Sequence, residues 1–443
     1  MTTFQKSGAL FTDLYELTMA AAYFDHNVTD NAAFSLFIHN YPKNRNYFVA
    51  AGLAETLNEL ADFTFSDQDI DYLKSTGLFN DNFLSYLKGF KFTGTVRAMP
   101  EGTIFFKDEP VLEVCAPLIE AQLVETLLIN TIGFQTLIAT KAARCIHAAK
   151  GRTLIDFASR RTQGKDAALK VARSSYIAGF SATSNVLAGK LYGIPISGTM
   201  AHSYVTAFEN EIKSFEKYAE TYPKNSVFLI DTYDTIEGAK NAANVALSMK
   251  KKGNALIGVR LDSGDMATLS RQVRKILDDA GLPDVKIFAS SGFDEYKIAD
   301  IIKNGACIDA FGVGTKMGVS ADAPYLDIVY KMVRFKDKNI QKRSPGKINL
   351  PGEKQVFRQT DEKGRFSGDT IGLKNETITD NMIALLEIVM KNGRIITTPP
   401  SLDEIRKTFA RNFSCLDDAY KKIVGAAPYP VMISRQLMKI QNN

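Results

Sequence analysis

The sequence predicts an α/β protein in which a parallel (βα) barrel occupies the middle of the chain and a β-rich domain takes in both ends. Three observations predict this class. Short apolar runs alternate with helix-length segments at intervals of roughly 25–40 residues, as in repeated βα units. Short β-prone pieces punctuated by glycine and proline precede the runs, and β-prone sequence returns after residue 330. No GxGxxG follows the first run, which favours a barrel over a dinucleotide-binding sheet.

The length and composition fit a globular protein of more than one domain. The chain has 443 residues, of which 45% are apolar and 23% charged. We divide it into an N-terminal β-rich and helical domain (1–118), an α/β barrel domain (119–330) and a C-terminal segment (331–443) that rejoins the first domain. The net charge of +5 is weak for this length, so we expect no nucleic-acid partner, although a basic excess can serve anionic small molecules.

The cysteine usage and the N-terminus indicate a cytoplasmic protein. The four cysteines are widely spaced and form no CxxC pair, which argues against a disulfide framework or a structural zinc site. The first residues lack the basic and apolar regions of a signal peptide, and no apolar stretch is long enough to span a membrane. We therefore expect no membrane partner, and we assign no residue as a metal ligand.

The first helix is predicted to begin near residue 13. Asp13 and Glu16 have the spacing of a capping box, and apolar residues from Leu14 to Phe24 fall on one helical face. Tyr15 lies about 100° away from that face, since a helix has about 3.6 residues per turn. We therefore expect Tyr15 to be a partly exposed ring.

The predicted barrel strands follow a long helix over roughly 119–149. Near-continuous apolar runs with helical crossovers are typical of a parallel sheet. In βα barrels the active site is built by the loops at the carboxyl ends of the strands. Polar residues or glycines follow each run directly, which indicates one common site. The six runs are Thr153–Phe157, Ile194–Ser197, Val227–Ile230, Leu256–Leu261, Val285–Ala289 and Ile308–Val313.

Two glycine-containing loops are candidates for binding phosphate. The sequence FGVGTK after the last run contains Gly312, Gly314 and Thr315, and Ser291 and Gly292 follow the preceding run. Glycines let the backbone approach a phosphate, and consecutive N–H groups can surround it. No Walker motif is present, so a tight turn without a ligand is an equally open reading of FGVGTK.

Charged residues at the strand ends indicate an anionic, hydroxyl-bearing ligand. Arg260 stands beside Asp262 and Asp265. A guanidinium grips a carboxylate or phosphate at two points, and carboxylates accept hydrogen bonds from ribose hydroxyls or hold Mg²⁺ through water. Arg160 and Arg161 add two positive charges to the same rim. A structural Arg–Asp pair is the alternative for Arg260.

One histidine stands out among the four in the chain. His202 follows a predicted barrel strand, whereas the other three lie in segments that we interpret as structural or surface. A neutral imidazole can act as a base or a nucleophile. We therefore place His202, with Asp262, in the candidate catalytic group.

Several motifs together resemble the nicotinate phosphoribosyltransferase family. They occur in the correct order and cover nearly the whole chain. They are FTDLYELTM (11–19), PLIEAQLVETL (117–127), GTMAHS (198–203), VRLDSGD (259–265), GVGT (312–315) and KRSPGK (342–347). The resemblance implies an incomplete α/β barrel of the type II phosphoribosyltransferase kind, a β-rich domain formed by both chain ends, and homodimers with active sites at the interface.

The resemblance also implies roles in binding nicotinate. Tyr15 would stack on the pyridine ring, from the neighbouring subunit, and Thr199 and Arg260 would contact nicotinate. The stretch Ile196–Thr206 offers hydroxyls and no acid, which suits a carboxylate ligand. The amide of nicotinamide would require an acceptor, so nicotinamide phosphoribosyltransfer is the nearest alternative.

The remaining implied roles concern phosphoribosyl pyrophosphate and ATP. Thr315 would bind phosphoribosyl pyrophosphate, with Gly312 and Gly314 around its 5′-phosphate. ATP would phosphorylate His202, and hydrolysis of the phosphohistidine would drive the reaction. Mg²⁺ would accompany the pyrophosphate. The implied product is nicotinate mononucleotide, for NAD biosynthesis.

Other classes fit the residues less well. Quinolinate, a dicarboxylate, would require more cations. Small purine and pyrimidine phosphoribosyltransferases carry two adjacent acids after an apolar strand, whereas Asp231 stands alone. A barrel aldolase needs a lysine on a strand, and only Lys286 comes near one. A non-catalytic phosphosugar-binding barrel remains open, but it would not need His202.

Overall fold

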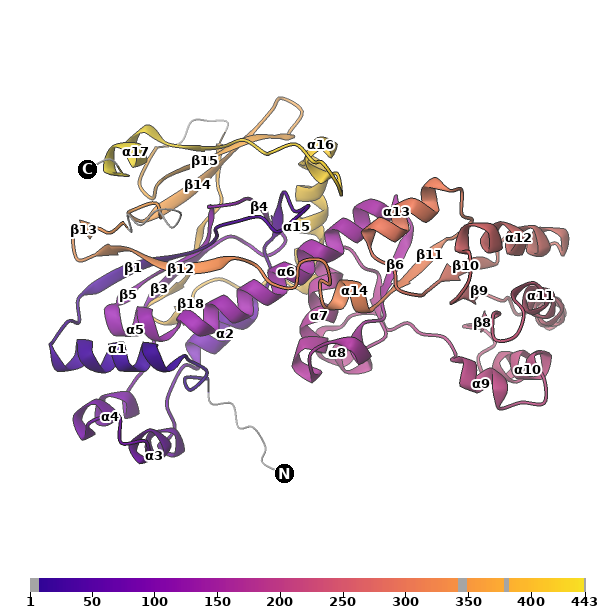
Figure 1. The fold of residues 1–443 in the computed structure, drawn as a ribbon, viewed down its shortest axis with the longest axis horizontal. Helices are drawn as coiled ribbons and strands as arrows, with labels where there is room; N and C mark the ends of the chain where they lie inside the picture. The colour runs from indigo at the N-terminus through magenta and orange to yellow at the C-terminus, as the bar shows by residue number, and fades with distance from the viewer. Residues whose placement is uncertain (1–7, 342–348, 378–381, 442–443) are drawn as a thin grey trace. The chain divides into compact units, whose positions relative to one another are not determined.

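The computed structural model describes residues 8–341, 349–377 and 382–441, which form two compact units (Figure 1). Unit 1 combines the chain up to Ala139 with the chain from Tyr325 onward, and unit 2 consists of Thr140–Pro324. The motif KRSPGK lies outside the described residues.

Unit 1 contains a seven-stranded sheet that draws its strands from both ends of the chain. β1 (Asn31–Ile38) pairs antiparallel with β5 (Pro110–Pro117) on one side and with β12 (Ile328–Phe335) on the other. The predicted β-rich domain made by both ends is thus confirmed. The sheet continues through β13 (Lys338–Asn339) at one edge and β3 (Thr95–Ala98), β17 (Glu387–Lys391) and β18 (Arg394–Ile395) at the other.

Two smaller sheets and a set of helices complete unit 1. The four-stranded sheet has the order β16 (Met382–Ala384), β14 (Lys354–Thr360), β15 (Phe366–Leu373) and β19 (Val431–Ile433), and β2 (Phe48–Val49) pairs with β4 (Ile104–Phe105). The helices are α1 (Leu14–Asp25), α2 (Leu53–Ala61), α3 (Asp67–Ser75), α4 (Asp81–Lys88), α5 (Leu118–Leu123), α15 (Leu402–Cys415), α16 (Asp418–Lys421) and α17 (Arg435–Gln441). α6 (Glu125–Ala149) runs from unit 1 into unit 2.

The prediction of a single helix over 119–149 is wrong, because Val124 leaves the helical conformation (φ −95°, ψ 0°) and separates α5 from α6.

The start of α1 differs from its sequence prediction. Asp13 is the N-cap, but its side chain makes no capping bond. Glu16 is buried and accepts hydrogen bonds from Thr12 Oγ1 (2.6 Å) and from Thr126 Oγ1 (2.5 Å) at the start of α6. The predicted capping box is therefore wrong, since Glu16 is used to join two helices. Tyr15 is 46% exposed, as expected, but Leu14, which the spacing placed on the apolar face, is 55% exposed.

Unit 2 is built on a six-stranded sheet whose pairings are all parallel. Its order is β7 (Ala182–Thr183), β6 (Thr153–Asp156), β11 (Ala310–Val313), β10 (Lys286–Ala289), β9 (Gly258–Leu261) and β8 (Val227–Leu229). β7 and β8 form the two edges, so the barrel is incomplete, as expected. The helices are α7 (Lys165–Ile177), α8 (Val186–Tyr192), α9 (His202–Thr206), α10 (Glu211–Thr221), α11 (Thr235–Lys251), α12 (Met266–Asp279), α13 (Glu295–Lys303) and α14 (Thr315–Gly318), with a 3₁₀ turn at Ser159–Arg161.

Five of the six predicted runs contain strands of this sheet, and one does not. In the run Ile194–Ser197, Ile196 makes only an isolated parallel bridge to Thr183. The edge strand there is instead β7, whose two residues are too few to be recognised as an apolar run. The prediction of a strand over Ile194–Ser197 is therefore wrong, although the segment still follows the sheet edge.

Close packing of helix on strand fixes the end of β8. A Cβ added to Gly238 of α11 would lie 2.0 Å from the carbonyl oxygen of Ile230, so only glycine permits this approach. The residues that follow, Asp231 and Thr232, are thereby held at the edge of the sheet. In the described part of the chain, no helix combines the length and the apolar character needed to cross a bilayer.

Candidate active site

His202 lies between the ends of two strands of unit 2. It begins α9, and its Nδ1 is 3.1 Å from Thr232 Oγ1, in the loop after β8. Its Nε2 is 3.8 Å from Asp262 Oδ2, in the loop after β9. The imidazole is thus oriented through Nδ1, while Nε2 faces a carboxylate.

Arg260, in β9, presents a guanidinium whose hydrogen bonding is incomplete. Its Nη1 donates to Thr199 Oγ1. Its Nε is buried and has no hydrogen-bond partner among the described residues. Burial lowers the pKa of Arg260, while the charges of Asp262 and Asp231 act to raise it. A buried unpaired donor costs about 1–3 kcal/mol, so this nitrogen indicates the place of a ligand acceptor.

Two carboxylates stand beside Arg260, and a hydrogen-bond network fixes them. Asp231 Oδ2 accepts from the backbone N–H of Asp262 (2.8 Å) and from Ser263 Oγ (2.7 Å). Asp262 Oδ1 accepts from Ser290 Oγ, which follows β10. Asp231 Oδ1 is buried and unpaired within the described residues. The ends of β8, β9 and β10 are therefore joined through side chains.

The two loops predicted to bind phosphate have different surroundings. Ser291 and Gly292 are exposed and both have positive φ, +111° and +61°. Thr315 is exposed at the first position of α14, and Gly314 precedes it. Gly312 is buried in β11, where an added Cβ would lie 2.5 Å from the ring of Phe157. Gly312 thus serves close packing, Gly314 is half-buried against the backbone of Phe157, and Ser291, Gly292 and Thr315 are exposed.

The remaining candidates are placed less centrally. Arg160 and Arg161 are exposed, and the charge of Arg160 reaches Arg260, where it lowers the pKa. Asp265 caps α12 by accepting from the backbone N–H groups of Ala267 (3.2 Å) and Thr268 (3.4 Å). Tyr15 belongs to unit 1, where its hydroxyl bonds to Glu125, and burial followed by the charge of Glu125 raises its pKa.

Three residues of the cluster are absent from the sequence-based site. Thr232, Asp231 and Ser290 hold His202, the backbone after β9, and Asp262. Each lies within three residues of the end of β8 or β10, so the position at a strand end was the available signal. The sequence does not show which of these side chains form hydrogen bonds with one another, because the partners lie far apart along the chain.

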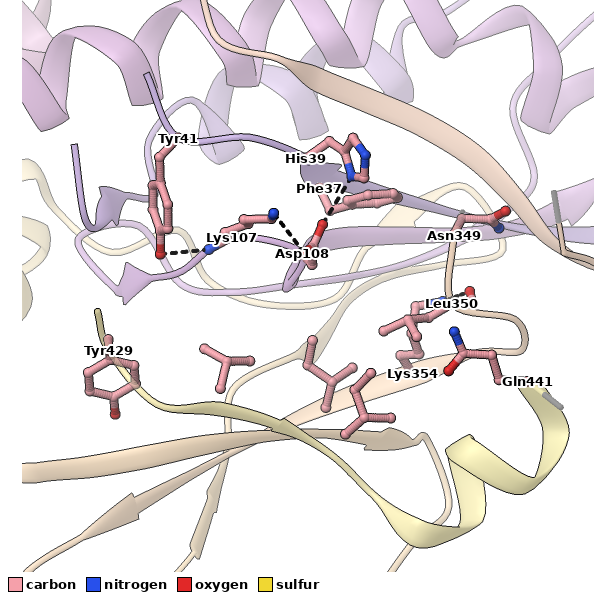
Figure 2. A pocket seen from close by; sticks show the side chains of 13 residues that line it. Phe37, His39, Tyr41, Lys107, Asp108, Asn349, Leu350, Lys354, Tyr429 and Gln441 are labelled. Atoms are coloured by element: carbon pink, nitrogen blue, oxygen red, sulfur yellow. Dashed lines mark hydrogen bonds and ion pairs between the residues drawn. The ribbon is translucent and has the colours of Figure 1, made fainter. Parts of the chain in front are cut away.

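A cavity of about 440 Å³ lies elsewhere, in unit 1, and contains none of the predicted site residues (Figure 2). On one wall, Asp108 Oδ1 is 3.1 Å from His39 Nδ1, and Asp108 Oδ2 is 3.8 Å from Lys107 Nζ. Ile371, Val431 and Ile433 from the four-stranded sheet also line it. Among the described residues, no group of three His, Cys, Asp or Glu side chains is arranged to hold a metal ion.

The fold and the strand-end cluster define an α/β-barrel enzyme that acts on small anionic molecules. Three family models match the chain: the nicotinate phosphoribosyltransferase N-terminal domain (residues 10–133), the nicotinate phosphoribosyltransferase family (153–360) and its C-terminal domain (377–441). The chain is 46% identical to a nicotinate phosphoribosyltransferase of Mycobacterium tuberculosis, over 98% of this chain and 93% of that protein. It is 40% identical to the Bacillus subtilis nicotinate phosphoribosyltransferase, over 96% and 93%.

Solved structures agree with the sequence relatives. The crystal structure of human nicotinic acid phosphoribosyltransferase matches with a TM-score of 0.88 and 28% identity, covering 97% of this chain and 99% of that one. A nicotinate-nucleotide pyrophosphorylase from Pyrococcus furiosus matches with a TM-score of 0.77 and 26% identity, over 94% and 97%. This chain belongs to the nicotinate phosphoribosyltransferase family.

Proposed function

We propose that this chain transfers the phosphoribosyl group of phosphoribosyl pyrophosphate to nicotinate, forming nicotinate mononucleotide for NAD biosynthesis. The proposal rests on the hydrogen bonding of Arg260. Its Nη1 donates to Thr199, and its buried Nε has no partner among the described residues. A carboxylate on the ligand would supply the missing acceptor and form the two-point contact that guanidinium favours. Family membership supplies the reaction.

The proposed chemistry exchanges one bond at the ribose. The pyridine nitrogen of nicotinate forms a bond to C1′ as the bond from C1′ to the pyrophosphate oxygen breaks, and pyrophosphate leaves with the electron pair. Positive charge develops on the ribose ring, so carboxylates near it are favourable. Asp262 and Asp231 supply them, and they can also accept hydrogen bonds from the ribose hydroxyls. Tyr15 is proposed to stack on the pyridine ring and align its nitrogen.

Phosphoribosyl pyrophosphate is proposed to bind at the loops after β10 and β11. Ser291, Gly292 and Thr315 are exposed and Gly314 is half-buried, and their backbone N–H groups would bind the 5′-phosphate. Gly312 contributes indirectly, because the absence of a side chain lets the ring of Phe157 pack against β11 just before the loop. Arg160, whose charge reaches Arg260, is the better placed of the two adjacent arginines, and Arg161 adds charge to the rim.

Mg²⁺ is proposed to accompany the pyrophosphate. The unpaired carboxylate oxygen of Asp231 is the kind of ligand that Mg²⁺ accepts, directly or through water. When bound, the ion would neutralise charge on the leaving group. The protein's own part is to hold Asp231 rigidly through its bonds from Asp262 and Ser263.

ATP is proposed to phosphorylate His202. Because Thr232 engages Nδ1, the nitrogen available as a nucleophile is Nε2. Nδ1 would keep the imidazole proton and donate it to Thr232 Oγ1, while Nε2 would form a bond to the γ-phosphorus as the bond to ADP breaks. Asp262, 3.8 Å from Nε2, would stabilise the positive charge that develops on the ring. Later hydrolysis of the phosphohistidine would make the overall transfer more favourable.

A homodimer is proposed as the working assembly. Phe11, Leu14 and Tyr15 are exposed in unit 1, and Val186, Leu187 and Leu191 are exposed on α8 in unit 2. Clusters of large exposed apolar side chains mark protein contact surfaces.

The cytoplasmic location of the protein stays a prediction from the sequence.

Product formation tests the proposal. Nicotinate, phosphoribosyl pyrophosphate and Mg²⁺ are incubated with the protein, with and without ATP, beside a parallel reaction with nicotinamide. We expect nicotinate mononucleotide that increases with ATP, and little product from nicotinamide. Product from nicotinamide alone would shift the assignment to the amide, for which Asp231 Oδ1 is an acceptor. No product from either base would favour a non-catalytic phosphosugar-binding barrel.

The variant His202→Ala tests the role proposed for His202. Stimulation of product formation by ATP should disappear in this variant; if the stimulation persists, the proposed role of His202 is wrong.

A further inference from the structure

Two lysines lie beside the loop that follows β10. Lys297, in the first turn of α13, donates from Nζ to the carbonyl oxygen of Ser291 (2.7 Å). Lys316, in α14, donates from Nζ to Asp294 Oδ2 (2.8 Å). Both ammonium groups therefore lie at the loops proposed to bind the phosphoribosyl ligand, and the proposed chemistry has not yet used either of them.

The charges around these lysines do not balance. Asp294 is nearly buried, bonds to Lys316 and attracts Lys297. The neighbouring Glu295 does not add to it, because two buried cations of α6, Lys141 (2.6 Å) and Arg144 (2.8 Å), bond to its carboxylate. Two ammonium groups thus face one available carboxylate, which leaves a positive excess at the loop.

The lowered pKa of Lys297 is consistent with this excess of positive charge. Burial lowers the pKa of its ammonium group, and the charge of Lys316 lowers it further. A ligand anion placed between the two would relieve that repulsion. Lys297 also donates to the carbonyl oxygen of Ser291, whose φ of +111° is a conformation that non-glycine residues adopt only under constraint.

We propose that Lys297 and Lys316 form a phosphate subsite, in which their ammonium groups bind a phosphate group of the phosphoribosyl ligand. Lys316 then shares its bond between Asp294 and the ligand, and Lys297 also keeps the Ser291–Gly292 turn open to it. The identity of the ligand rests on the proposed function. The competing explanation is that the Lys316–Asp294 pair only fastens the loop to α14.

The two explanations predict opposite effects for one variant. If Lys316 binds the ligand, Lys316→Met weakens binding, whereas Asp294→Asn leaves it equal or tighter, because the competing carboxylate is gone. Asparagine still caps α13, where Asp294 accepts from the backbone N–H of Lys297 (2.8 Å). If the Lys316–Asp294 ion pair only holds the loop against α14, both variants remove the ion pair and weaken ligand binding to the same extent.

Calorimetric titration with two probes decides between them. Ribose 5-phosphate and inorganic pyrophosphate are titrated separately in the presence of Mg²⁺, and the probe that responds identifies the phosphate group. We expect Lys316→Met and Lys297→Met to weaken one probe by roughly tenfold or more, as for loss of a charge-assisted contact. Lys303→Met, at the exposed end of α13, is the matched control and should change neither. Thermal unfolding of each variant verifies its fold.

Several outcomes would overturn the subsite. They are affinities within about twofold of the wild type in both lysine variants, equal losses in Lys316→Met and Asp294→Asn, or a wild type that binds neither probe. Product formation by the wild type is measured in parallel. Failure to make nicotinate mononucleotide would defeat the proposed function, but the titrations would still decide whether these lysines bind phosphate.

Discussion

At the scale of single residues, the site depends on side chains fixed by partners from other strands. Arg260 was predicted from its place beside two aspartates, but its bond to Thr199 and its unpaired Nε follow only from the fold. Asp265 stood in the same motif, yet it caps a helix. The spacing of polar residues therefore predicts where a site lies, and it does not tell a ligand-facing carboxylate from a capping one.

The first prediction concerns Arg260. In Arg260→Lys, the KM for nicotinate should rise by roughly 10–100-fold, because an ammonium group cannot reproduce a two-point contact with a carboxylate. The KM for phosphoribosyl pyrophosphate should stay within about twofold in the same variant. Thr199→Val should give a smaller rise for nicotinate, since it removes the oxygen that orients Nη1. Steady-state kinetics with each substrate varied separately measures both constants. Equal effects on the two KM values would contradict the assignment.

At the scale of elements, packing decides features that periodicity cannot. Five of the six apolar runs predicted strands of the sheet correctly, because buried parallel strands are apolar over their whole length. The break at Val124 and the two-residue strand β7 were missed, since neither leaves a pattern in the sequence. Glu16 was assigned to a capping box, whereas its burial against Thr126 depends on a helix from a distant segment.

The second prediction tests the packing of β11. Gly312→Ala should destabilise the protein by about 1–3 kcal/mol, because the new methyl group overlaps the ring of Phe157. Gly198→Ala is the control, since an added Cβ there meets no atom within 4 Å. Thermal or denaturant unfolding of the two variants makes the comparison. Similar stability of both would show that the ring moves aside readily and that close packing is not the role of Gly312.

The third prediction concerns the pH dependence of α1. Burial raises the pKa of Glu16 from 4.5 to about 7, although hydrogen bonds from Thr12 and Thr126 oppose the shift. Between these two values the folded protein holds a proton that the unfolded chain releases. The free energy of unfolding should therefore fall as pH rises through this window.

Glu16→Gln tests that dependence. The variant should lose this part of the pH dependence and gain about 1–2 kcal/mol over the wild type at pH 8. Glu362→Gln, in the exposed turn between β14 and β15, should follow the wild type. Denaturant unfolding between pH 4.5 and 8 measures the difference. A wild type and Glu16→Gln with parallel profiles would show that Glu16 titrates near its ordinary value.

At the scale of the whole molecule, the sequence predicted that both chain ends build one β-rich domain, but it did not predict every strand pairing inside that domain. The return of β-prone sequence after residue 330 indicated that the C-terminal segment rejoins the first domain, and β12 does pair with β1. That β17 pairs with β3 at the far side could not be predicted, because no local pattern specifies which edge a distant strand will join. Tyr15 belongs to unit 1 and His202 to unit 2, so their assignment to one site stays a prediction.

The last prediction tests whether Tyr15 acts in the site of a neighbouring subunit. If Tyr15 serves the site of a neighbouring subunit, then Tyr15→Ala and His202→Ala each lack a different contribution to a shared site. In a heterodimer of the two variants, one site receives both intact side chains and the other receives neither. An equal mixture, unfolded and refolded together, should recover about a quarter of the wild-type ATP-stimulated activity, since half of the dimers are mixed and each has one good site. Each variant refolded alone is the control. No recovery, with dimers present in sedimentation, would place Tyr15 and His202 in the same subunit's site, and a fully active monomer would remove the dimer from the mechanism altogether.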